Sequence, residues 1–300
     1  MNAKLPSKVT IGLPVYNGEP FLHEAIESVL QQGHTNFELI ISDNGSTDRT
    51  ETICREFAEK DERIRYYRSD VNRGASWNYN RTFELATGEY FRWLAADDYL
   101  APTLLEKSVT ILENHPEVVL AFSWVVDIDA DGRELEVKRS TVNSTRQRPN
   151  ERFRGLSEVR GSHNCEEVFG LIRKDILACT KLIDNYTDSD RTLLAELGLH
   201  GPFHEIAESL FYHRLHEKGS VTANPTRHMR AAWFDPKLAQ KLVFPNWRQL
   251  YEMLMVPLRV PISLQERLLC YKHLFRWTIR RRQHLRKDLV WASRQLLGYS

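Results

Sequence analysis

Four short apolar runs alternate with three amphipathic stretches in the first hundred residues of this 300-residue chain. Residues 9–13, 37–42, 64–67 and 90–94 are rich in β-branched and aromatic side chains, which favour strands. Between them, residues 21–30, the stretch after Ser46 and residues 75–86 carry apolar side chains at helical spacing. Strands that alternate with helices form right-handed crossovers and a parallel sheet. The sequence therefore predicts an α/β fold with a mostly parallel, Rossmann-like sheet flanked by helices.

The rest of the chain extends this pattern and then changes. Further strands are predicted at 118–126, 168–172 and 210–216, and helices at 104–112 and 190–199. After Ser220, helical patterns interrupted by prolines continue to the end. We therefore expect a first domain at 1–222 and a C-terminal helical region at 223–300. Within the first domain, Ser46 or Thr47 is expected to cap the second helix and Gly88 to end the third.

Two adjacent carboxylates, Asp97 and Asp98, follow the strand predicted at 90–94. Open α/β sheets bind ligands at the carboxyl ends of their strands, and a divalent cation that bridges a diphosphate prefers such oxygen ligands. The alternative is that the pair caps a helix beginning near Pro102. Neighbouring parallel strands lie about 4.8 Å apart, so the ends of the first two strands should line the same crevice. These ends contribute Pro14, Tyr16, Asn17 and Asp43.

The residues at these strand ends suit a nucleotide. Tyr16 can stack on a nucleobase, and an ionised Asp43 can accept a hydrogen bond from an N–H of uracil or guanine. Each has a simpler alternative, Tyr16 as an exposed loop side chain and Asp43 as a turn-forming residue. No glycine-rich phosphate loop follows the first strand. A metal is therefore expected to hold the diphosphate.

Two other segments have ambiguous patterns. Residues 127–132 resemble the start of a calcium loop, but Lys138 stands where the bidentate glutamate belongs, so a hairpin turn is predicted. Residues 138–163 are polar and basic. They are interpreted either as a solvated loop or as a mobile lid whose cations meet an anionic substrate.

The composition narrows the class of protein. Lys and Arg number 41 and Asp and Glu 40, a net charge of +1, which implies no general attraction to nucleic acid. The four cysteines lie far apart without C-x-x-C spacing, as in proteins of a reducing compartment. The first residues lack the apolar core of a signal peptide, and no apolar run approaches about 20 residues. We expect a cytoplasmic protein.

Several ordered motifs resemble one known family. They are VTIGLPVYN at 9–17, FELIISDNGSTD at 37–48, Asn72 to Gly74 with Asn80, Gly88 to Tyr90, and Ala96 to Asp98. Together they are similar to the inverting glycosyltransferases of family two, which have the GT-A fold, over about residues 8–216. Ala95 stands where many members have a further Asp. The processive Q-x-x-R-W signature is absent, which argues against a polymer synthase.

The resemblance implies roles for the residues of the first strand ends. Pro14 and Tyr16 correspond to the position that packs on the nucleotide base, and Asp43 to the carboxylate that binds the base. Asp98 corresponds to the metal ligand of the family. Asp97 corresponds to a residue beside the ribose or the sugar.

The resemblance also extends to the second half of the domain. Asp190, within residues 188–196, best matches the catalytic base. Arg214 and His216 resemble the closing R-x-H segment beside the diphosphate, where His216 is a candidate second metal ligand, a phosphate contact or a surface histidine. Asn17 and Asn80 lie in matched motifs and are candidate substrate-binding residues.

The implied reaction is a single displacement that inverts the anomeric configuration. Asp190 would deprotonate an acceptor hydroxyl, and Mn²⁺ or Mg²⁺ would stabilise the leaving nucleoside diphosphate. The donor would be a nucleotide sugar, a UDP-sugar being favoured, and the acceptor a glycan or a lipid-linked molecule, in glycan or polysaccharide biosynthesis. For Asp190 the alternative is a helix N-cap, and Asp188 is the neighbour that can be mistaken for the base.

Two other functions remain as alternatives. A nucleotidyltransferase can share such a sheet and metal site, but residues 13–19 lack the cation that would grip a triphosphate. A non-catalytic sugar-nucleotide or glycan-binding protein would be expected to have lost Asp98 or Asp190, and both are present.

The C-terminal region contains a basic amphipathic pattern. Its apolar residues recur on one face of a helix, and Lys and Arg surround them. Such a helix can contact an anionic membrane peripherally. The alternative is packing on its own domain or in a homodimer, which the carboxylates Glu266 and Asp288 favour because they dilute the charge. The apolar residues are Leu264, Leu268, Tyr271, Phe275 and Ile279.

Overall fold

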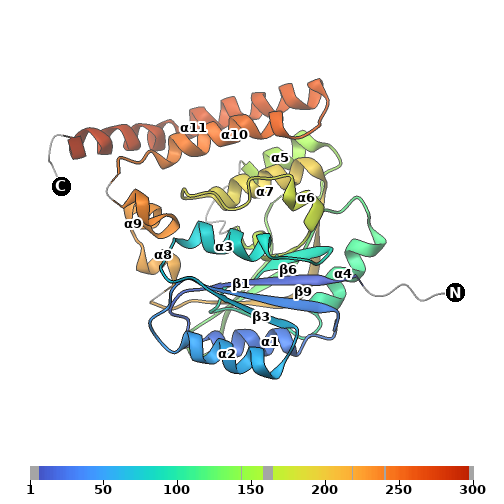
Figure 1. Cartoon of the computed structure of the whole chain (residues 1–300). Helices are drawn as coiled ribbons and strands as arrows, with labels where there is room; N and C mark the ends of the chain where they lie inside the picture. Colours follow the sequence, from blue (N-terminus) through green and yellow to red (C-terminus); the bar gives the residue numbers. More distant parts are fainter. Residues whose placement is uncertain (1–6, 143, 158–164, 218, 240, 297–300) are drawn as a thin grey trace.

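The computed structural model describes residues 7–142, 144–157, 165–217, 219–239 and 241–296. Within these ranges a nine-stranded sheet has the order β3-β2-β1-β4-β8-β6-β9-β5, and β7 pairs with β6 beside it. Helices cover both faces of the sheet: α1 and α2 lie on one face and α3 on the other (Figure 1). The predicted α/β class is therefore confirmed.

The first half of the sheet is parallel, as predicted. β1 pairs with β2 and β4, and β2 pairs with β3, all in parallel register. Every residue of β1 is buried, because helices on both faces exclude water from the strand. The strands are β1 (Val9–Val15), β2 (Phe37–Asp43), β3 (Ile64–Arg68) and β4 (Tyr90–Trp93). The crossover helices are α1 (Leu22–Leu30), α2 (Thr50–Lys60) and α3 (Ala75–Glu84).

The second half of the sheet is mixed. β8 runs antiparallel between β4 and β6, whereas β6 and β9 are parallel. Because β8 is short, it leaves β4 and β6 paired with it only near their first residues. The elements are α4 (Leu104–Asn114), β5 (Tyr99–Leu100), β6 (Leu120–Ile128), β7 (Glu134–Lys138), β8 (Leu171–Arg173) and β9 (Phe203–Arg214).

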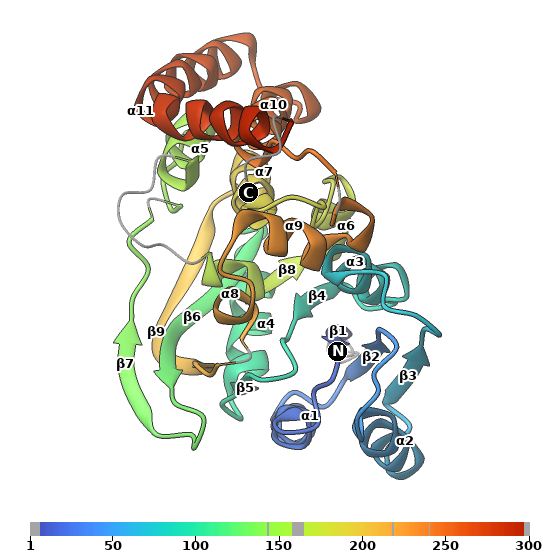
Figure 2. The same cartoon turned by 90° about the vertical axis from the view of Figure 1, so that its left-hand side faces the viewer.

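The helices that follow β7 form a layer over the α3 face of the sheet. α7 (Ser189–His200) contacts α5 (Pro149–Ser157), α10 (Pro245–Arg259) packs on α7, and α11 (Leu264–Leu296) packs on α10 and α5. In Figures 1 and 2, α10 and α11 form the outermost layer. Shorter elements are η1 (Glu166–Phe169), α6 (Lys174–Ala178), α8 (Ser220–Ala223), α9 (Arg227–Phe234) and η2 (Pro236–Leu238). None of the described helices is both long and apolar enough to cross a membrane.

Two predicted helix ends differ in the structure. The second helix begins at Thr50, and the side chain of Asp48, rather than Ser46 or Thr47, accepts a hydrogen bond from its first N–H. The third helix ends at Glu84, before Gly88. Gly88 instead allows a close backbone approach, because a Cβ there would lie 2.7 Å from the backbone nitrogen of Thr10.

The segment at 138–163 is not a plain solvated loop over its described part, and its role as a lid stays a prediction. It includes α5, and Arg152 is buried there, donating to the carbonyls of Gly198, Arg146 and Gln147. Residue 143 and residues 158–163 of the predicted lid lie outside the described residues. The predicted hairpin turn connects β6 and β7, although Asp127 and Ile128 still belong to β6, and Gly132 in the turn has a φ of +82°. The predicted strand at 168–172 is η1 followed by β8.

Candidate active site

The two acidic residues Asp97 and Asp98 lie between β4 and β5, and not at a helix end. α4 begins only at Leu104, after Thr103, so the helix-capping alternative is wrong. Tyr99 pairs instead with Tyr212 of β9, which brings the two strands together at this edge. Oδ1 of Asp98 accepts a 2.9 Å hydrogen bond from the backbone N–H of Arg214 at the end of β9.

Asp98 is buried in a negatively charged environment. Its residue is only 2% exposed. Burial raises the pKa of Asp98 well above its ordinary value, and the negative charge of Asp97 raises it further, while the N–H and guanidinium of Arg214 act in the opposite direction. A cation beside the two carboxylates would relieve this repulsion.

His216 contacts the second carboxylate of the pair, Asp97. Its Nε2 is 2.9 Å from Oδ2 of Asp97, and its ring meets that of Phe21 edge-on, with 4.8 Å between ring centroids. A carboxylate partner of this kind orients an imidazole ring. Phe21 lies immediately before α1, so this helix also supports the acidic pair.

Arg214 is a buried residue that joins several loops. Its Nε donates to the carbonyl of Asp97 at 3.0 Å, and one terminal nitrogen donates to the carbonyls of Asp129 and Ala130, each at 3.2 Å. The other terminal nitrogen pairs with Glu24 of α1. The contacts of Arg214 thus position the acidic pair, and its predicted contact with a diphosphate stays a prediction. The sequence carried no signal for Glu24 as its partner.

The end of β1 leads into a strained turn. Tyr16 is 49% exposed, which leaves its ring available for stacking. Asn17 has a φ of 53°, and its Oδ1 accepts a 2.8 Å hydrogen bond from the N–H of Thr47. Pro14 lies within β1, opposite Ser42 of β2. The first two strand ends are therefore tied together, as their predicted common crevice requires.

Asp43 at the end of β2 is fully buried. Its Oδ1 accepts a 2.8 Å bond from the N–H of Ser46, and its Oδ2 accepts one of the same length from the hydroxyl of Tyr66. Nε of Arg68 is 3.4 Å from Oδ2. These contacts are those of the turn-forming alternative, and binding of a base by Asp43 stays a prediction.

Asp190 lies in the first turn of α7, with Oδ1 accepting from the N–H of Arg191. The N-cap position belongs to Asp188, which has a φ of 68° and makes no capping side-chain bond. Burial raises the pKa of Tyr79, and the charges of Asp97, Asp98 and Asp190 raise it further. The negative charges of these three carboxylates therefore act in the same direction on this one hydroxyl.

Sequence reasoning missed one residue of α3, Tyr79, and misassigned another, Asn80. Tyr79 was not predicted, because an aromatic residue at helical spacing is indistinguishable from a core residue. Asn80 was a candidate substrate-binding residue, but both ends of its amide bond the main chain of Ile183: Nδ2 donates to the carbonyl and Oδ1 accepts from the N–H. Asn80 therefore holds the loop that leads to α7.

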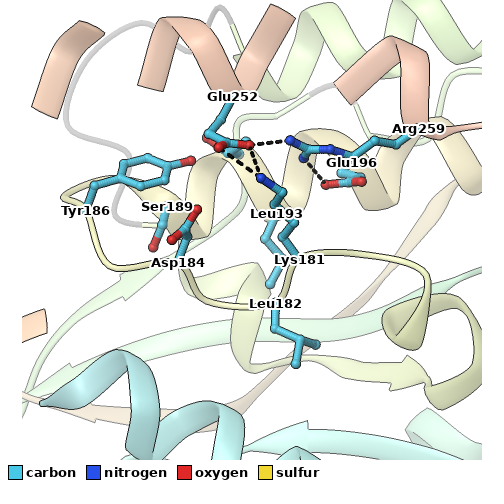
Figure 3. A pocket seen from close by; sticks show the side chains of 10 residues that line it. Lys181, Leu182, Asp184, Tyr186, Ser189, Leu193, Glu196, Glu252 and Arg259 are labelled. Atoms are coloured by element: carbon cyan, nitrogen blue, oxygen red, sulfur yellow. Dashed lines mark hydrogen bonds and ion pairs between the residues drawn. The ribbon is translucent and has the colours of Figure 1, made fainter. Parts of the chain in front are cut away.

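A second charged cluster lies between α7 and α10 (Figure 3). Glu252 of α10 is buried and pairs with Lys181, Arg248 and Arg259. Arg259 also contacts Glu196 of α7 at 3.2 Å, and burial raises the pKa of Glu196. The adjoining cavity of about 10 Å³ has room for about one water molecule. This cluster fixes α7, which carries Asp190, against the C-terminal helices.

The acidic edge suits a divalent cation shared with a substrate. Among the described residues, no group of three or more His, Cys, Asp or Glu side chains is arranged to hold a metal. Mg²⁺ commonly binds through one or two carboxylates, with water and substrate phosphates as its other ligands. Asp98 offers a buried carboxylate, and His216, which contacts Asp97, offers an imidazole nitrogen, so the donor atoms present fit such a cation.

Comparisons with known proteins identify relatives of this chain. An uncharacterized glycosyltransferase of Methanocaldococcus jannaschii, MJ1057, is 35% identical over 130 residues, which cover 43% of this chain and 45% of that protein. One from Haemophilus influenzae is 34% identical over 130 residues, covering 43% and 51%. The aligned part thus spans about half the length of these curated relatives.

Solved structures share the fold. The crystal structure of S. aureus TarS in complex with UDP-GlcNAc matches with a TM-score of 0.64 and 18% identity, over 92% of this chain and 72% of that chain. The mannosyltransferase PcManGT from Pyrobaculum calidifontis, in complex with GDP-Man and Mn²⁺, matches with a TM-score of 0.52 and 17% identity, over 98% and 88%. The model of the family Glycosyl transferase family 2 matches residues 10–180, which is more than half of the chain. The chain therefore belongs to glycosyl transferase family 2.

Proposed function

We propose that this protein transfers a sugar from a nucleoside-diphosphate sugar to an acceptor hydroxyl with inversion of the anomeric configuration. The observation that carries the proposal is the acidic pair between β4 and β5, in which Asp98 is held by Arg214 and Asp97 contacts His216. Family membership supports the reaction class. The division into a catalytic domain at 1–222 and a helical region at 223–300 is part of the proposal.

Different residues would act on the acceptor hydroxyl and on the leaving diphosphate. Asp190 would accept the proton of the acceptor hydroxyl as general base, which typically contributes 10²- to 10⁴-fold in rate. Asp98 and His216 would hold Mn²⁺ or Mg²⁺, and Asp97 would lie beside the ribose or sugar. The bound cation would supply Lewis-acid stabilisation of the leaving diphosphate. Arg214 would keep the acidic pair in place.

The nucleotide would lie over the ends of β1 and β2. Exposed Tyr16, beside Pro14 and Asn17, would pack on the base. A UDP-sugar is the favoured donor, since the structure of TarS contains UDP-GlcNAc, and GDP-Man, bound by PcManGT, is the next candidate. The acceptor would be a glycan or a lipid-linked molecule in glycan or polysaccharide biosynthesis.

Release of nucleoside diphosphate from a panel of UDP-, GDP- and TDP-sugars tests the proposal. Turnover should require Mn²⁺ or Mg²⁺ and disappear in EDTA. Asp98→Asn should lower it by roughly 10²-fold or more, whereas Asp131→Asn, at the exposed β6–β7 turn, should not. Full turnover in EDTA contradicts the metal role. Binding of donors without turnover would identify a binding protein, and consumption of a nucleoside triphosphate with a sugar phosphate a nucleotidyltransferase.

A further inference from the structure

The outer face of the α10–α11 hairpin carries two exposed apolar stripes. On α11, Leu268 is 61% and Phe275 68% exposed, and Leu264 and Ile279 are exposed on the same face. On α10, Trp247, Tyr251, Leu254 and Leu258 are all exposed and recur at i, i+4, i+7 and i+11. Apolar residues scattered singly over a surface are ordinary, but a contiguous patch marks an interaction site.

The two stripes lie side by side. The hydroxyl of Tyr271, which belongs to the α11 stripe by its spacing, donates a 3.2 Å bond to the carbonyl of Leu254 on α10. Nearer the turn between the helices, Nε of Arg267 donates to the carbonyl of Pro257 at 2.9 Å. At the other end, Nε1 of Trp247 donates to the carbonyl of Leu285 at 3.1 Å. These contacts set an antiparallel register in which the stripes form one surface, which we call the hairpin face.

α11 packs on its own domain through a different side. Cys270, Leu274, Trp277 and Leu285 of α11 are buried toward α10 and α5. Of the residues that the sequence pattern selected as the apolar face, Tyr271 is half-buried and the other four are exposed. Intramolecular packing of α11 leaves the hairpin face uncovered.

The carboxylates of the hairpin all point inward. Glu252 is buried in the cluster with Arg259, Glu266 binds Arg148 and Asn150, and Asp288 binds the N–H of Asn246. These three are the only acidic residues of 245–296, the described part of the hairpin, which has eleven Lys and Arg. Contrary to the expectation from the sequence, Glu266 and Asp288 therefore do not offset the positive charge of the outer surface.

Cations border and extend the apolar stripe of α11. Lys272 is four residues after Leu268, and Arg276 is three before Ile279, so both flank it, and both are exposed. Arg282 and Arg286 continue the stripe toward the C-terminus at helical spacing and are exposed as well. A near-neutral chain thus presents a face that is apolar along its middle and positive along its margin.

We propose that the hairpin face lies on an anionic lipid surface, with its apolar stripes in the interface and Lys272, Arg276, Arg282 and Arg286 at the headgroups. Such interfaces bind an apolar stripe with a positive margin, because the burial of apolar surface and the attraction of cations to anionic lipids both favour binding. A second copy of the chain is the less favourable occupant. An isologous contact would oppose two positive margins that lack carboxylates.

Sedimentation of the full chain with vesicles tests the proposal without any nucleotide sugar, so its failure leaves the proposed transferase untouched. Binding is expected at low salt to phosphatidylcholine vesicles that contain phosphatidylglycerol, and much weaker binding to phosphatidylcholine alone or at high salt. Lys272→Gln with Arg276→Gln should weaken binding roughly 30-fold. Leu268→Ser with Phe275→Ser should weaken it roughly 10-fold or more.

The matched control replaces exposed apolar residues outside the hairpin face. Leu135→Ser with Val137→Ser, on β7, should leave vesicle binding unchanged. The proposal is overturned if the wild-type chain stays in the supernatant with anionic vesicles at low salt, or if the β7 control loses as much binding as the hairpin variants. It is also overturned if the chain is a dimer that Phe275→Ser dissociates while vesicle binding is absent.

Discussion

The backbone N–H of Arg214 donates to Oδ1 of Asp98 across 116 positions of sequence. The same residue's guanidinium donates to the carbonyl of Asp97. One residue at the end of β9 therefore determines where both carboxylates lie relative to the ends of β1 and β4. The site depends on the pairing of β5 with β9, which brings these segments together.

Arg214→Lys should destabilise the chain and weaken its use of metal. A lysine cannot contact Glu24 and the carbonyls of Asp97 and Asp129 at once, and a buried acceptor left without a donor costs roughly 1–3 kcal/mol. Urea unfolding should therefore show a lower free energy of unfolding, and donor turnover should need more Mn²⁺. Glu24→Gln is the control, with less than about 1 kcal/mol expected because Glu24 is half exposed. Wild-type stability in Arg214→Lys would contradict the positioning role.

Asp190→Asn should separate catalysis from binding. Removing a general base lowers kcat by roughly 10²- to 10⁴-fold, while affinity for the nucleoside diphosphate should stay near wild type. Asp188→Asn is a matched control, because asparagine tolerates the positive φ of that position. Steady-state kinetics and nucleotide titration give the two readings. The assignment is wrong if Asp188→Asn loses turnover and Asp190→Asn keeps it.

Stability should depend on Glu38 at acidic pH. Burial by itself raises the pKa of Glu38, but hydrogen bonds from Thr10, Thr87 and Lys8 outweigh it and lower the pKa from 4.5 to about 2. A depressed folded-state pKa means that this stabilisation, about 3 kcal/mol, is complete above pH 4.5 and is lost as the pH falls toward 2.

Urea unfolding of Glu38→Gln across this range checks the expectation. The variant should be less stable than wild type at pH 7, and the difference should shrink below pH 4.5. The exposed Glu56→Gln should follow wild type throughout. A difference between Glu38→Gln and wild type that is the same at every pH would refute the linkage.

Glu252→Gln should loosen α10 from α7. Loss of the buried charge leaves Lys181, Arg248 and Arg259 without their common partner. Breaking a buried pair costs roughly 3–5 kcal/mol, and we expect about 2–4 kcal/mol here because Lys181 and Arg248 are half exposed and can rehydrate. Chemical denaturation measures the loss, with the exposed Glu84→Gln as control. An unchanged unfolding midpoint would show that the cluster does not hold α7 against α10.

Local patterns were enough to predict the parallel half of the sheet and the place of Asp97 and Asp98. Residues 9–94 alternate strand and helix signals over short distances, and a carboxylate pair after a buried strand must lie at its carboxyl end. The family resemblance then singled out Asp190, whose charge acts on the pKa of Tyr79 in the same direction as the charges of the acidic pair.

Contacts between distant segments decided the rest. Asn80 holds Ile183, 103 positions away, and no local pattern distinguishes such an amide from one that faces a substrate. In α11, periodicity identified Leu268 and Phe275 as one face of a helix. Whether that face turns inward depends on where α10 and α5 pack, because the opposite side of α11 is also able to bury apolar residues such as Leu274 and Trp277. Only the tertiary structure decides between two such faces, since helical spacing is the same for a buried and an exposed stripe.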